Sequence, residues 1–347
     1  MMQRDTPADL HKLHNLQRAL DESVDLGAPA RLKKLVHWEL DHLPAPAGGA
    51  TLQRWQALAA VAQSDLSLAK LYEGHTDALA IMLELGGPLP APGAVWGMWA
   101  AEAPGHRVTI TPAADGQICI DGSKAWCSGA ATSSHALLTA WHPDGRDPQL
   151  VQVALQQPGV SISGDHWQAV GMQASASLEV RFQQANAVLV GSPGDYLQRP
   201  GFWHGGAGIA ACWYGGSLAL ASALCAAVGP TASTASNPFR CAALGKVDLA
   251  LQGTAALLRQ AAHAMDDQPR RETSALALRL RQSAEGTARL VLDEVSRALG
   301  ATPLCQNRHF ARAAADLPVF IRQSHAERDF AALGERVGAE GATTWML

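Results

Sequence analysis

Leucines spaced three or four residues apart run through the first part of the chain and predict helices. The clearest stripe follows a capping hydroxyl and a proline at Thr6-Pro7. It comprises Leu10, Leu13, Leu16 and Leu20. Thr51 and Ser64 can cap two further helices, the second of which stops at Gly86-Gly87-Pro88. The pattern therefore predicts an N-terminal α-helical domain over residues 1–93.

Alternating apolar and polar residues replace the helical spacing after Pro92. Residues 107–110 and 117–120 alternate and are separated by a turn at Asp115-Gly116. The same pattern predicts strands at residues 135–141, 150–155 and 178–182. We therefore expect a middle β domain, of barrel or sandwich type, over residues 94–197.

Helical periodicity returns from Gly205 and continues to the C-terminal part of the chain. One apolar stripe, which Gly300 ends, comprises Leu276, Leu280, Ala284, Ala288, Val291, Val295 and Leu299. A last helix is predicted from about Asn307 to Leu333. Residues 198–347 are thus predicted to form a four-helix bundle, and the fold class is α+β multidomain. Helices, strands and helices in that order do not predict a Rossmann domain, which alternates strands with helices.

The composition is that of a globular protein, with 48% apolar and 17% charged residues among 347. The net charge of −4 gives no electrostatic reason to expect nucleic acid or an anionic membrane as a partner. Residues 205–229 are nearly all apolar, but they are rich in glycine and alanine and contain Ser217 and Ser222. This composition favours a buried bundle helix over a membrane span.

The six cysteines include no C-x-x-C pair, so we expect neither a metal site nor a redox pair. Residues 1–20 alternate charges with leucines and contain no apolar stretch typical of a signal peptide. Together these features predict a reduced, cytoplasmic protein.

Three motifs, in this order, resemble the acyl-CoA dehydrogenase family over nearly the whole chain. Residues 64–87 are similar to the family's buried helix before the β domain. Residues 121–129, D-G-S-K-A-W-C-S-G, resemble the N-G-x-K-x-W-I-T-N stretch, and residues 171–182 resemble G-M-R-x-T-x-S-x-x-V-x-F. The resemblance implies bound FAD, an acyl thioester as substrate, and a homodimer or homotetramer. It also implies that Trp126 packs on the flavin ring, that Ser128 bonds the flavin near N5, and that His75 lies near the substrate cavity.

The sequence departs from the family at two sites that bind the flavin. The family's T-E-P-G-x-G-S-D loop is A-A-E-A-P-G-H here, so that Ala101 replaces the threonine. The backbone N–H groups of Ala100 and Ala101 could still bond the flavin. The R-x-x-F-G motif is also absent, and Arg240, which stands near its place, could reach a pyrophosphate or be an ordinary solvated arginine.

The catalytic base of the family, a glutamate in a Y-E-G-T stretch, has no counterpart here. Its position falls near Ser324 or His325. Glu327 could be the base, displaced by one turn, or His325 could be the base, since neutral imidazole accepts protons near pH 7. In the third alternative the protein has no dehydrogenase base, and His325 serves a different flavin reaction. The resemblance therefore implies α,β-dehydrogenation of an acyl thioester with FAD; the alternatives are a flavin monooxygenase, in which a C-terminal histidine and a serine stabilise a flavin hydroperoxide, and a non-catalytic flavin-binding scaffold.

Overall fold

The computed structural model describes residues 7–88, 90–112, 117–164, 166–229, 237–341 and 345–346. The chain divides into two compact units. The sheet unit comprises residues 1–43, 67–169 and 173–202, and the helical unit comprises residues 44–66, 170–172 and 203–347. The predicted cap at Thr6, the side chain of Leu10 and the turn at Asp115-Gly116 lie outside the described residues. The division into three domains at residues 93 and 197 stays a prediction.

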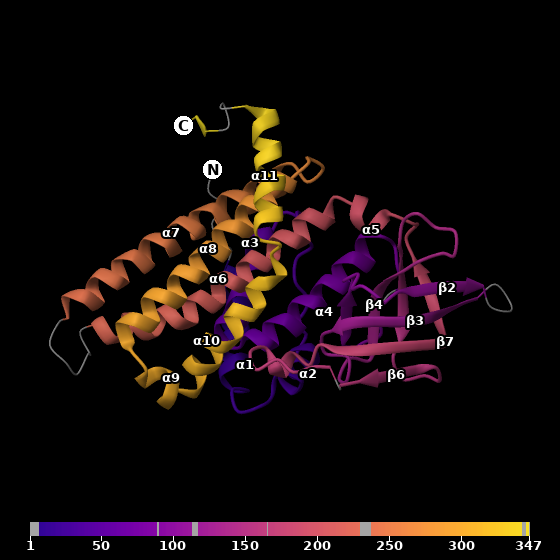
Figure 1. Ribbon diagram of the computed structural model, residues 1–347, viewed down its shortest axis with the longest axis horizontal. Coiled ribbons are helices and arrows are strands. Elements are labelled where there is room, and N and C mark those ends of the chain that lie inside the picture. Colours follow the sequence, from indigo (N-terminus) through magenta and orange to yellow (C-terminus); the bar gives the residue numbers. More distant parts are fainter. Residues whose placement is uncertain are drawn as a thin grey trace. The chain divides into compact units, whose positions relative to one another are not determined.

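The strands lie between residues 96 and 190, with helices before and after them, which confirms the coarse mixed α and β fold. They are β1 Trp96–Trp99, β2 Val108–Pro112, β3 Ile118–Cys127, β4 His135–Ala140, β5 Gln149–Ala154, β6 Val160–Ser163 and β7 Leu178–Val190. They form a mixed sheet of order β1-β4-β5-β7-β3-β2, in which β6 also pairs with β7 (Figure 1). The short strands β1 and β6 were not predicted, and β7 is longer than predicted.

The sheet unit has two apolar cores, one on each side of β4. Ala136 and Leu138 of β4 pack with Val108 and Phe182 in the first core. Leu137 points to the other side, where the second core includes Ile81 of helix α4 (Leu66–Glu84). Successive side chains of a strand point to opposite faces, so β4 is buried on both of them. Helix α4 therefore packs directly against β1 and β4.

Three further helices belong to the sheet unit: α1 Pro7–Asp21, α2 Ala28–His37 and α5 Asp195–Gln198. Leu16 and Leu20 of the predicted stripe are buried, and Leu13 is half-buried. The predicted cap at Ser64 is wrong, because Ser64 is the last residue of α3 (Thr51–Ser64) and α4 begins only at Leu66. Thr51 does not cap α3 either. Its hydroxyl accepts from the Ala47 amide and donates to Asp266, so it is engaged in a tertiary contact instead of capping the helix.

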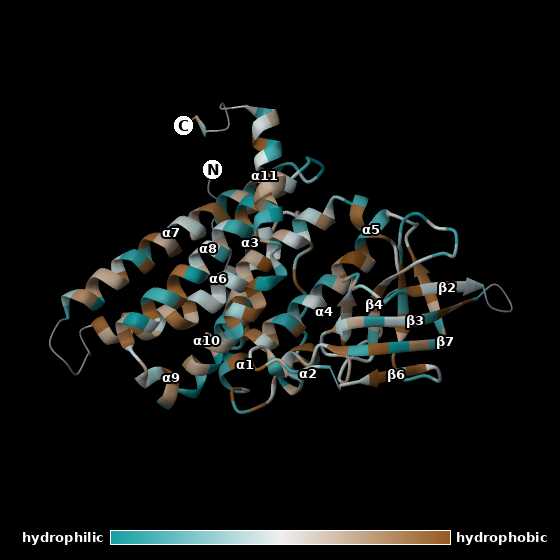
Figure 2. Cartoon of the chain, in the orientation of Figure 1, coloured by the Kyte–Doolittle hydropathy of each residue, from teal (hydrophilic) through white to brown (hydrophobic). Residues whose placement is uncertain are grey.

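The helical unit contains α3 and the C-terminal helices. These are α6 Gly201–Val228, α7 Pro238–Asp267, α8 Ser274–Leu299, α9 Thr302–Gln306, α10 Arg308–Phe320 and α11 Glu327–Glu340. Helix α7 lies alongside α8, and apolar and polar residues alternate along α8 as expected for a helix with one buried face (Figure 2). Gly300 follows α8 with a positive φ of 68°, as predicted for its end.

The single helix predicted for residues 307–333 is wrong. Helix α10 is followed by a short 3₁₀ turn, Ile321–Gln323, and the chain turns at Ala326, whose φ is +46°, before α11 begins. The break places His325 in a turn rather than on a helix face, so its side chain is not fixed by helical packing.

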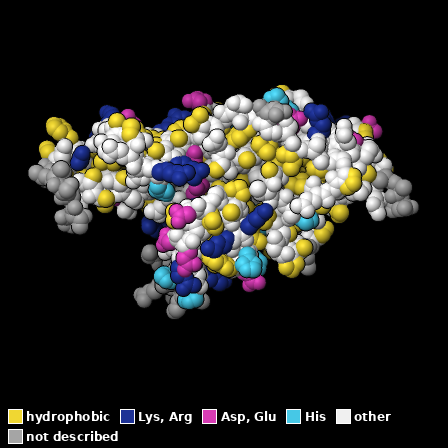
Figure 3. All heavy atoms as spheres, turned by 90° about the horizontal axis from the view of Figure 1, so that it is seen from below, with side chains coloured by type: hydrophobic (Ala, Val, Ile, Leu, Met, Phe, Trp, Pro, Cys, Tyr) yellow, Lys and Arg dark blue, Asp and Glu magenta, His cyan; other side chains and the backbone are white. Residues whose placement is uncertain are grey.

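Helices α6 and α7 are both long and apolar enough to cross a membrane by length and composition alone. In the most apolar stretch of 18 residues of each helix, 61% of the residues of α6 and 33% of those of α7 are buried. Trp213 and Leu224 of α6 are fully buried, as in the core helix that the sequence predicts. On the face of the molecule in Figure 3, basic, acidic and histidine side chains are intermixed rather than separated by sign.

We predict that two glycine substitutions in α6 change stability in opposite directions. A Cβ at Gly215 would lie 2.2 Å from the Ala59 carbonyl oxygen of α3, so Gly215→Ala should lower the free energy of unfolding by about 1–3 kcal/mol. A Cβ at Gly206 meets open space, so Gly206→Ala should raise it by about 0.5–1 kcal/mol. Urea denaturation measures both values. Equal effects of the two changes would contradict the close approach of α3 and α6.

Candidate functional site

An exposed tryptophan on β3 is the most unusual side chain of the sheet unit. The indole of Trp126 is 64% exposed, and its backbone has a φ of +56°, which is rare for a non-glycine residue. The register of β3 against β7 shifts between Lys124 and Cys127, as in a β-bulge. The extra residue lets Lys124 and Cys127 both point inward and turns Trp126 outward.

A set of hydrogen bonds from Trp99, Ser175 and Ser177 holds the turn after Trp126. The indole N–H of Trp99, at the end of β1, donates to the Ser128 carbonyl oxygen at 3.1 Å. The Ser128 hydroxyl lies 2.8 Å from the Ser177 hydroxyl, which lies 3.1 Å from that of Ser175. The amide of Gly129 donates to the Ser175 carbonyl oxygen at 2.9 Å. The Ser128 hydroxyl is therefore held in place two residues after the exposed indole.

A buried ion pair fixes the loop that follows β1. The Lys124 ammonium is fully buried, and its Nζ donates to Glu102 Oε1 at 2.6 Å and to the Thr139 hydroxyl at 2.6 Å. The Trp141 indole N–H donates to the other oxygen of Glu102 at 3.2 Å. Because Glu102 directly follows Ala100 and Ala101, this network holds their backbone beside the strand that carries Trp126.

The ion pair also changes the acidity of its members. Burial alone would raise the pKa of Glu102, but the hydrogen bonds from Lys124 and Thr139 offset this effect and lower the pKa below 4.5. Burial lowers the pKa of Lys124 more than Glu102 raises it. Burial also raises the pKa of the Cys127 thiol, which is fully buried, so this residue packs in the core and is not a reactive thiolate.

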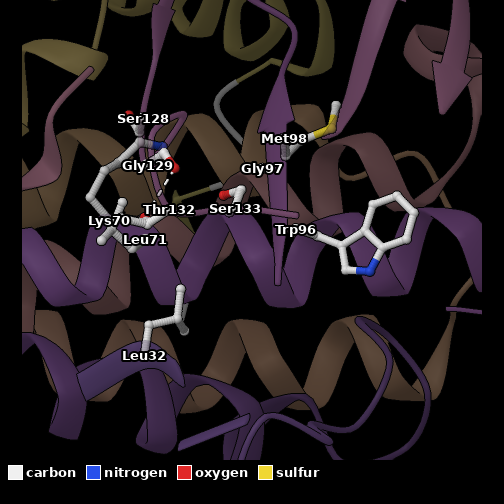
Figure 4. A pocket seen from close by; sticks show the side chains of 11 residues that line it. Leu32, Lys70, Leu71, Trp96, Gly97, Met98, Ser128, Gly129, Thr132 and Ser133 are labelled. Carbon is white, nitrogen blue, oxygen red and sulfur yellow. Dashed lines mark hydrogen bonds between the residues drawn. The ribbon is translucent and has the colours of Figure 1, made fainter. Parts of the chain in front are cut away.

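A small cavity lies between the Ser128 turn, β1 and α4. Figure 4 shows Ser128 and Gly129 of the turn next to Lys70 and Leu71 of α4 on one side, and Trp96 and Met98 of β1 on the other. Its volume of about 10 Å³ is that of one water molecule. A Cβ at Gly129, whose φ is +72°, would lie 2.9 Å from Leu71 Cδ2, so the turn can approach α4 this closely only with glycine there.

His75, predicted near the substrate cavity, is fully buried in α4. Its Nε2 lies 2.9 Å from Asp41 Oδ2, and its Nδ1 accepts the backbone N–H of Trp96 at 3.1 Å. Both ring nitrogens are thus bonded within the sheet unit. The predicted contact of His75 with a substrate stays a prediction.

His325 and Glu327, the two candidates for the base, lie at the start of α11 in the helical unit. His325 is 57% exposed, and its Nδ1 lies 3.3 Å from Asp329 Oδ1. Asp329 also accepts the backbone N–H of His325 at 3.1 Å, so one carboxylate orients both the turn and the imidazole. Glu327 is exposed in the first turn of α11.

Arg240 lies in the first turn of α7, which Asn237 caps by accepting its amide N–H. The guanidinium Nε donates to the Ala298 carbonyl oxygen at the end of α8, at 3.3 Å. The His325 turn contacts α8 through Gln282, whose amide donates to Ser324 at 2.9 Å. From the rise of an α-helix, Gln282 and Ala298 are roughly 24 Å apart along α8. The structure therefore does not bring Arg240 and His325 together.

Among the predicted site residues, the structure brings together Ala100, Ala101, Trp126 and Ser128. Sequence reasoning missed the groups that hold them, namely Lys124, Glu102, Thr139 and Ser177. The lysine inside the D-G-S-K-A-W motif was a usable signal, because a lysine on a strand beside apolar residues needs an acidic partner when it is buried. In the part of the chain that the structure describes, no group of three histidine, cysteine or acidic side chains could hold a metal ion.

Comparisons with known proteins agree with this geometry. The family model "Acyl-CoA dehydrogenase, middle domain" matches residues 103–185, which include Trp126 and Ser128. Butyryl-CoA dehydrogenase from Megasphaera elsdenii has a similar structure over 97% of this chain and 99% of its own, with a TM-score of 0.81 and 15% identity. The chain has the acyl-CoA dehydrogenase fold.

Other solved structures share the acyl-CoA dehydrogenase fold with this chain. Dibenzothiophene monooxygenase TdsC from Paenibacillus sp. A11-2 is 21% identical, with a TM-score of 0.77 over 94% of this chain and 96% of its own. KijD3, solved with FMN and a dTDP-linked amino keto sugar, is 17% identical, with a TM-score of 0.81 over 96% of this chain and 94% of its own. No curated protein sequence matches the chain significantly. At sequence identities of 15–21%, these similarities establish the fold of the chain but not its reaction.

We predict that Glu102→Gln destabilises the protein by about 1–3 kcal/mol at neutral pH. The change leaves the Lys124 ammonium buried without its acid, and the loss stays below that of a fully buried pair because Glu102 is 38% exposed. A carboxylate whose pKa is lowered on folding stabilises the protein above its unfolded pKa. The difference from wild type should therefore shrink as the pH falls below 4.5 and through the lower pKa of the folded protein.

Denaturation at several pH values between about 3 and 7 tests this expectation. Glu179→Gln is the matched control, because Glu179 pairs with the exposed Arg181, and it should change stability by less than about 0.5 kcal/mol. A pH-independent loss in Glu102→Gln would show that the ion pair does not carry the effect.

Proposed function

We propose that the protein is a flavin-dependent oxidoreductase that binds the isoalloxazine ring against Trp126. The observation that carries the proposal is the exposed indole at a strained bulge. A non-glycine residue at positive φ costs roughly 1–2 kcal/mol, and folding gains nothing from an aromatic ring that stays in water. A planar apolar ligand that covers the indole would account for both the positive φ and the exposure of Trp126.

The residues around Trp126 fit a flavin. The Ser128 hydroxyl, two residues after Trp126, is held by Ser177, which occupies only part of its hydrogen-bonding capacity, so it can also exchange a hydrogen bond with a ring edge. Glu102 and Lys124 fix the backbone of Ala100 and Ala101, whose N–H groups are further candidate donors. A bound flavin supplies the electron-accepting chemistry, and the protein binds, orients and shields the ring.

FAD is the cofactor that we propose, as the sequence resemblance implies. FMN is the alternative, because TdsC and KijD3 were both solved with FMN. Chromatography of the cofactor released by denaturation distinguishes the two. A cytoplasmic location and a homodimer or homotetramer are part of the same proposal.

For the reaction, we propose that His325 holds or moves the proton. Both His325 and Glu327 are exposed, but Asp329 orients the imidazole of His325 through Nδ1, which leaves Nε2 for a substrate. The sequence resemblance puts the glutamate position of the dehydrogenases near Ser324 or His325, where this chain has no carboxylate, and we therefore favour oxygenation of a small organic substrate. Dehydrogenation of an acyl thioester, with His325 as the base, is the second candidate.

We predict that the purified protein binds flavin and that Trp126→Ala weakens binding roughly 3- to 10-fold, the value of one aromatic stacking contact. Titration followed by flavin absorbance and fluorescence measures the affinity. Trp38→Ala is the matched control, because this indole is also partly exposed in the sheet unit, and it should bind flavin as wild type does. A protein that takes up neither FAD nor FMN would end the proposal.

The reaction is tested by titrating the flavin-loaded protein without air. An acyl-CoA should bleach the flavin absorbance if the protein is a dehydrogenase. A monooxygenase should be unaffected by acyl-CoA, and should consume oxygen once its flavin is supplied in reduced form. If the protein shows neither response, it is a flavin-binding scaffold, and the proposed catalysis is contradicted.

We predict that His325→Ala keeps the flavin affinity and the unfolding transition but lowers turnover about 100-fold or more, as for the loss of a general acid or base. Glu327→Gln, two residues away, should retain wild-type turnover. Steady-state rates of the two variants are compared under the same conditions. Loss of turnover in Glu327→Gln alone would assign proton transfer to Glu327 instead.

A further inference from the structure

A second cavity lies in the sheet unit, and none of its lining residues belongs to the proposed flavin site. It has a volume of about 790 Å³, within the range of sites for small molecules. It is lined by the end of α2, by Glu39, Asp41 and His42 after it, by helix α4, and by residues 86–88 and 90–94. Its apolar side chains are Val36, Leu79, Met82, Leu83 and several prolines and alanines. An apolar molecule of moderate size fits this lining.

Asp41 and His75 are the buried polar side chains of this cavity. Asp41 is only 5% exposed, and His75 is fully buried. Other polar side chains among the lining residues, those of His37, Glu39 and His42, are exposed. The buried part of a ligand in this cavity would therefore contact apolar side chains and one polar pair, Asp41 and His75.

The hydrogen bonds of His75 define its protonation. A backbone N–H can only donate, so Nδ1, which accepts from Trp96, carries no proton. The proton is on Nε2, which donates to Asp41 Oδ2 at 2.9 Å. The imidazole is therefore neutral and does not balance the charge of the carboxylate. Among the described residues, no lysine or arginine forms an ion pair with Asp41.

The second oxygen of Asp41 is left without a partner. Oδ1 is buried, and no described residue donates a hydrogen bond to it. Buried carboxylate oxygens are normally bonded, because losing water without a replacement is unfavourable. Asp41, which lines the cavity, thus has one carboxylate oxygen without a hydrogen bond and a negative charge without an ion pair within the described part of the chain.

We propose that this cavity binds a small apolar molecule that carries a primary ammonium group. The ammonium N–H donates to the Asp41 carboxylate and balances its charge, while the apolar part packs against Leu79 and Met82. A neutral hydroxyl supplies the hydrogen bond but not the charge, and a carboxylate supplies neither. The order of affinity is therefore amine, then alcohol, then acid.

The test uses three probes of nearly equal size: 2-phenylethylamine, 2-phenylethanol and phenylacetate. Calorimetry on the purified full chain at pH 7, in phosphate buffer because amine buffers would compete, measures their binding. The amine should bind at least tenfold more tightly than the alcohol, and phenylacetate should not bind. Asp41→Asn, which keeps the shape but removes the charge, should reduce amine affinity to that of the alcohol.

A second variant keeps the proposal testable if Asp41→Asn does not fold. Leu79→Trp fills the cavity without changing Asp41 or His75 and should abolish binding of the amine. Leu249→Trp makes the same change on the exposed surface of α7 and should bind the amine as wild type does. Flavin affinity should be unchanged in all three variants, so this proposal and the flavin proposal fail independently. No binding of the amine, or equal binding in wild type and Leu79→Trp, would show that Asp41 bonds only ordered water and would overturn the proposal.

Discussion

The fully buried ammonium of Lys124 is the constraint on which the candidate site depends. A lysine is rarely buried in a β-strand, because its charge then requires an acidic partner within hydrogen-bond distance. Here that partner is Glu102, which comes from the loop after β1, and Thr139 of β4 completes the set of acceptors. One ion pair therefore joins β3, β4 and the loop containing Ala100 and Ala101. Replacing it with apolar residues could preserve the core, but nothing would then hold the loop in one position.

The β-bulge and the ion pair explain each other. In a regular strand, Lys124 and Trp126 would share one face, and Cys127 would lie on the other. The extra residue buries both Lys124 and Cys127 and leaves only Trp126 outside. Because the lysine is held by Glu102 and the cysteine by the apolar core, the strained φ of Trp126 is imposed from both sides. The fold itself thus keeps the indole exposed.

Periodicity and short motifs predicted the order of elements well, because both depend on local sequence. Alternation located five strands, and the D-G-S-K-A-W-C-S-G motif located Trp126 and Ser128. What could not be predicted depends on distant partners. Thr51 has the chemistry of a helix cap, but its hydroxyl binds Asp266. Ala326 favours helix in any propensity scale, yet the chain turns there, where Asp329 accepts the His325 amide. The bulge gives no periodic signal, because a one-residue shift looks like an irregular strand.

Strand β1 connects the two sites proposed in the sheet unit. Its first residue, Trp96, donates its backbone N–H to His75, which bonds Asp41 in the second cavity. Its last residue, Trp99, donates its indole N–H to Ser128 in the turn beside Trp126. Between them, a Cβ at Gly97 would lie 2.6 Å from the Trp99 ring, so the indole can fold back over the strand only because residue 97 is glycine. The bonds of both sites thus converge on a four-residue strand packed between α4 and β4.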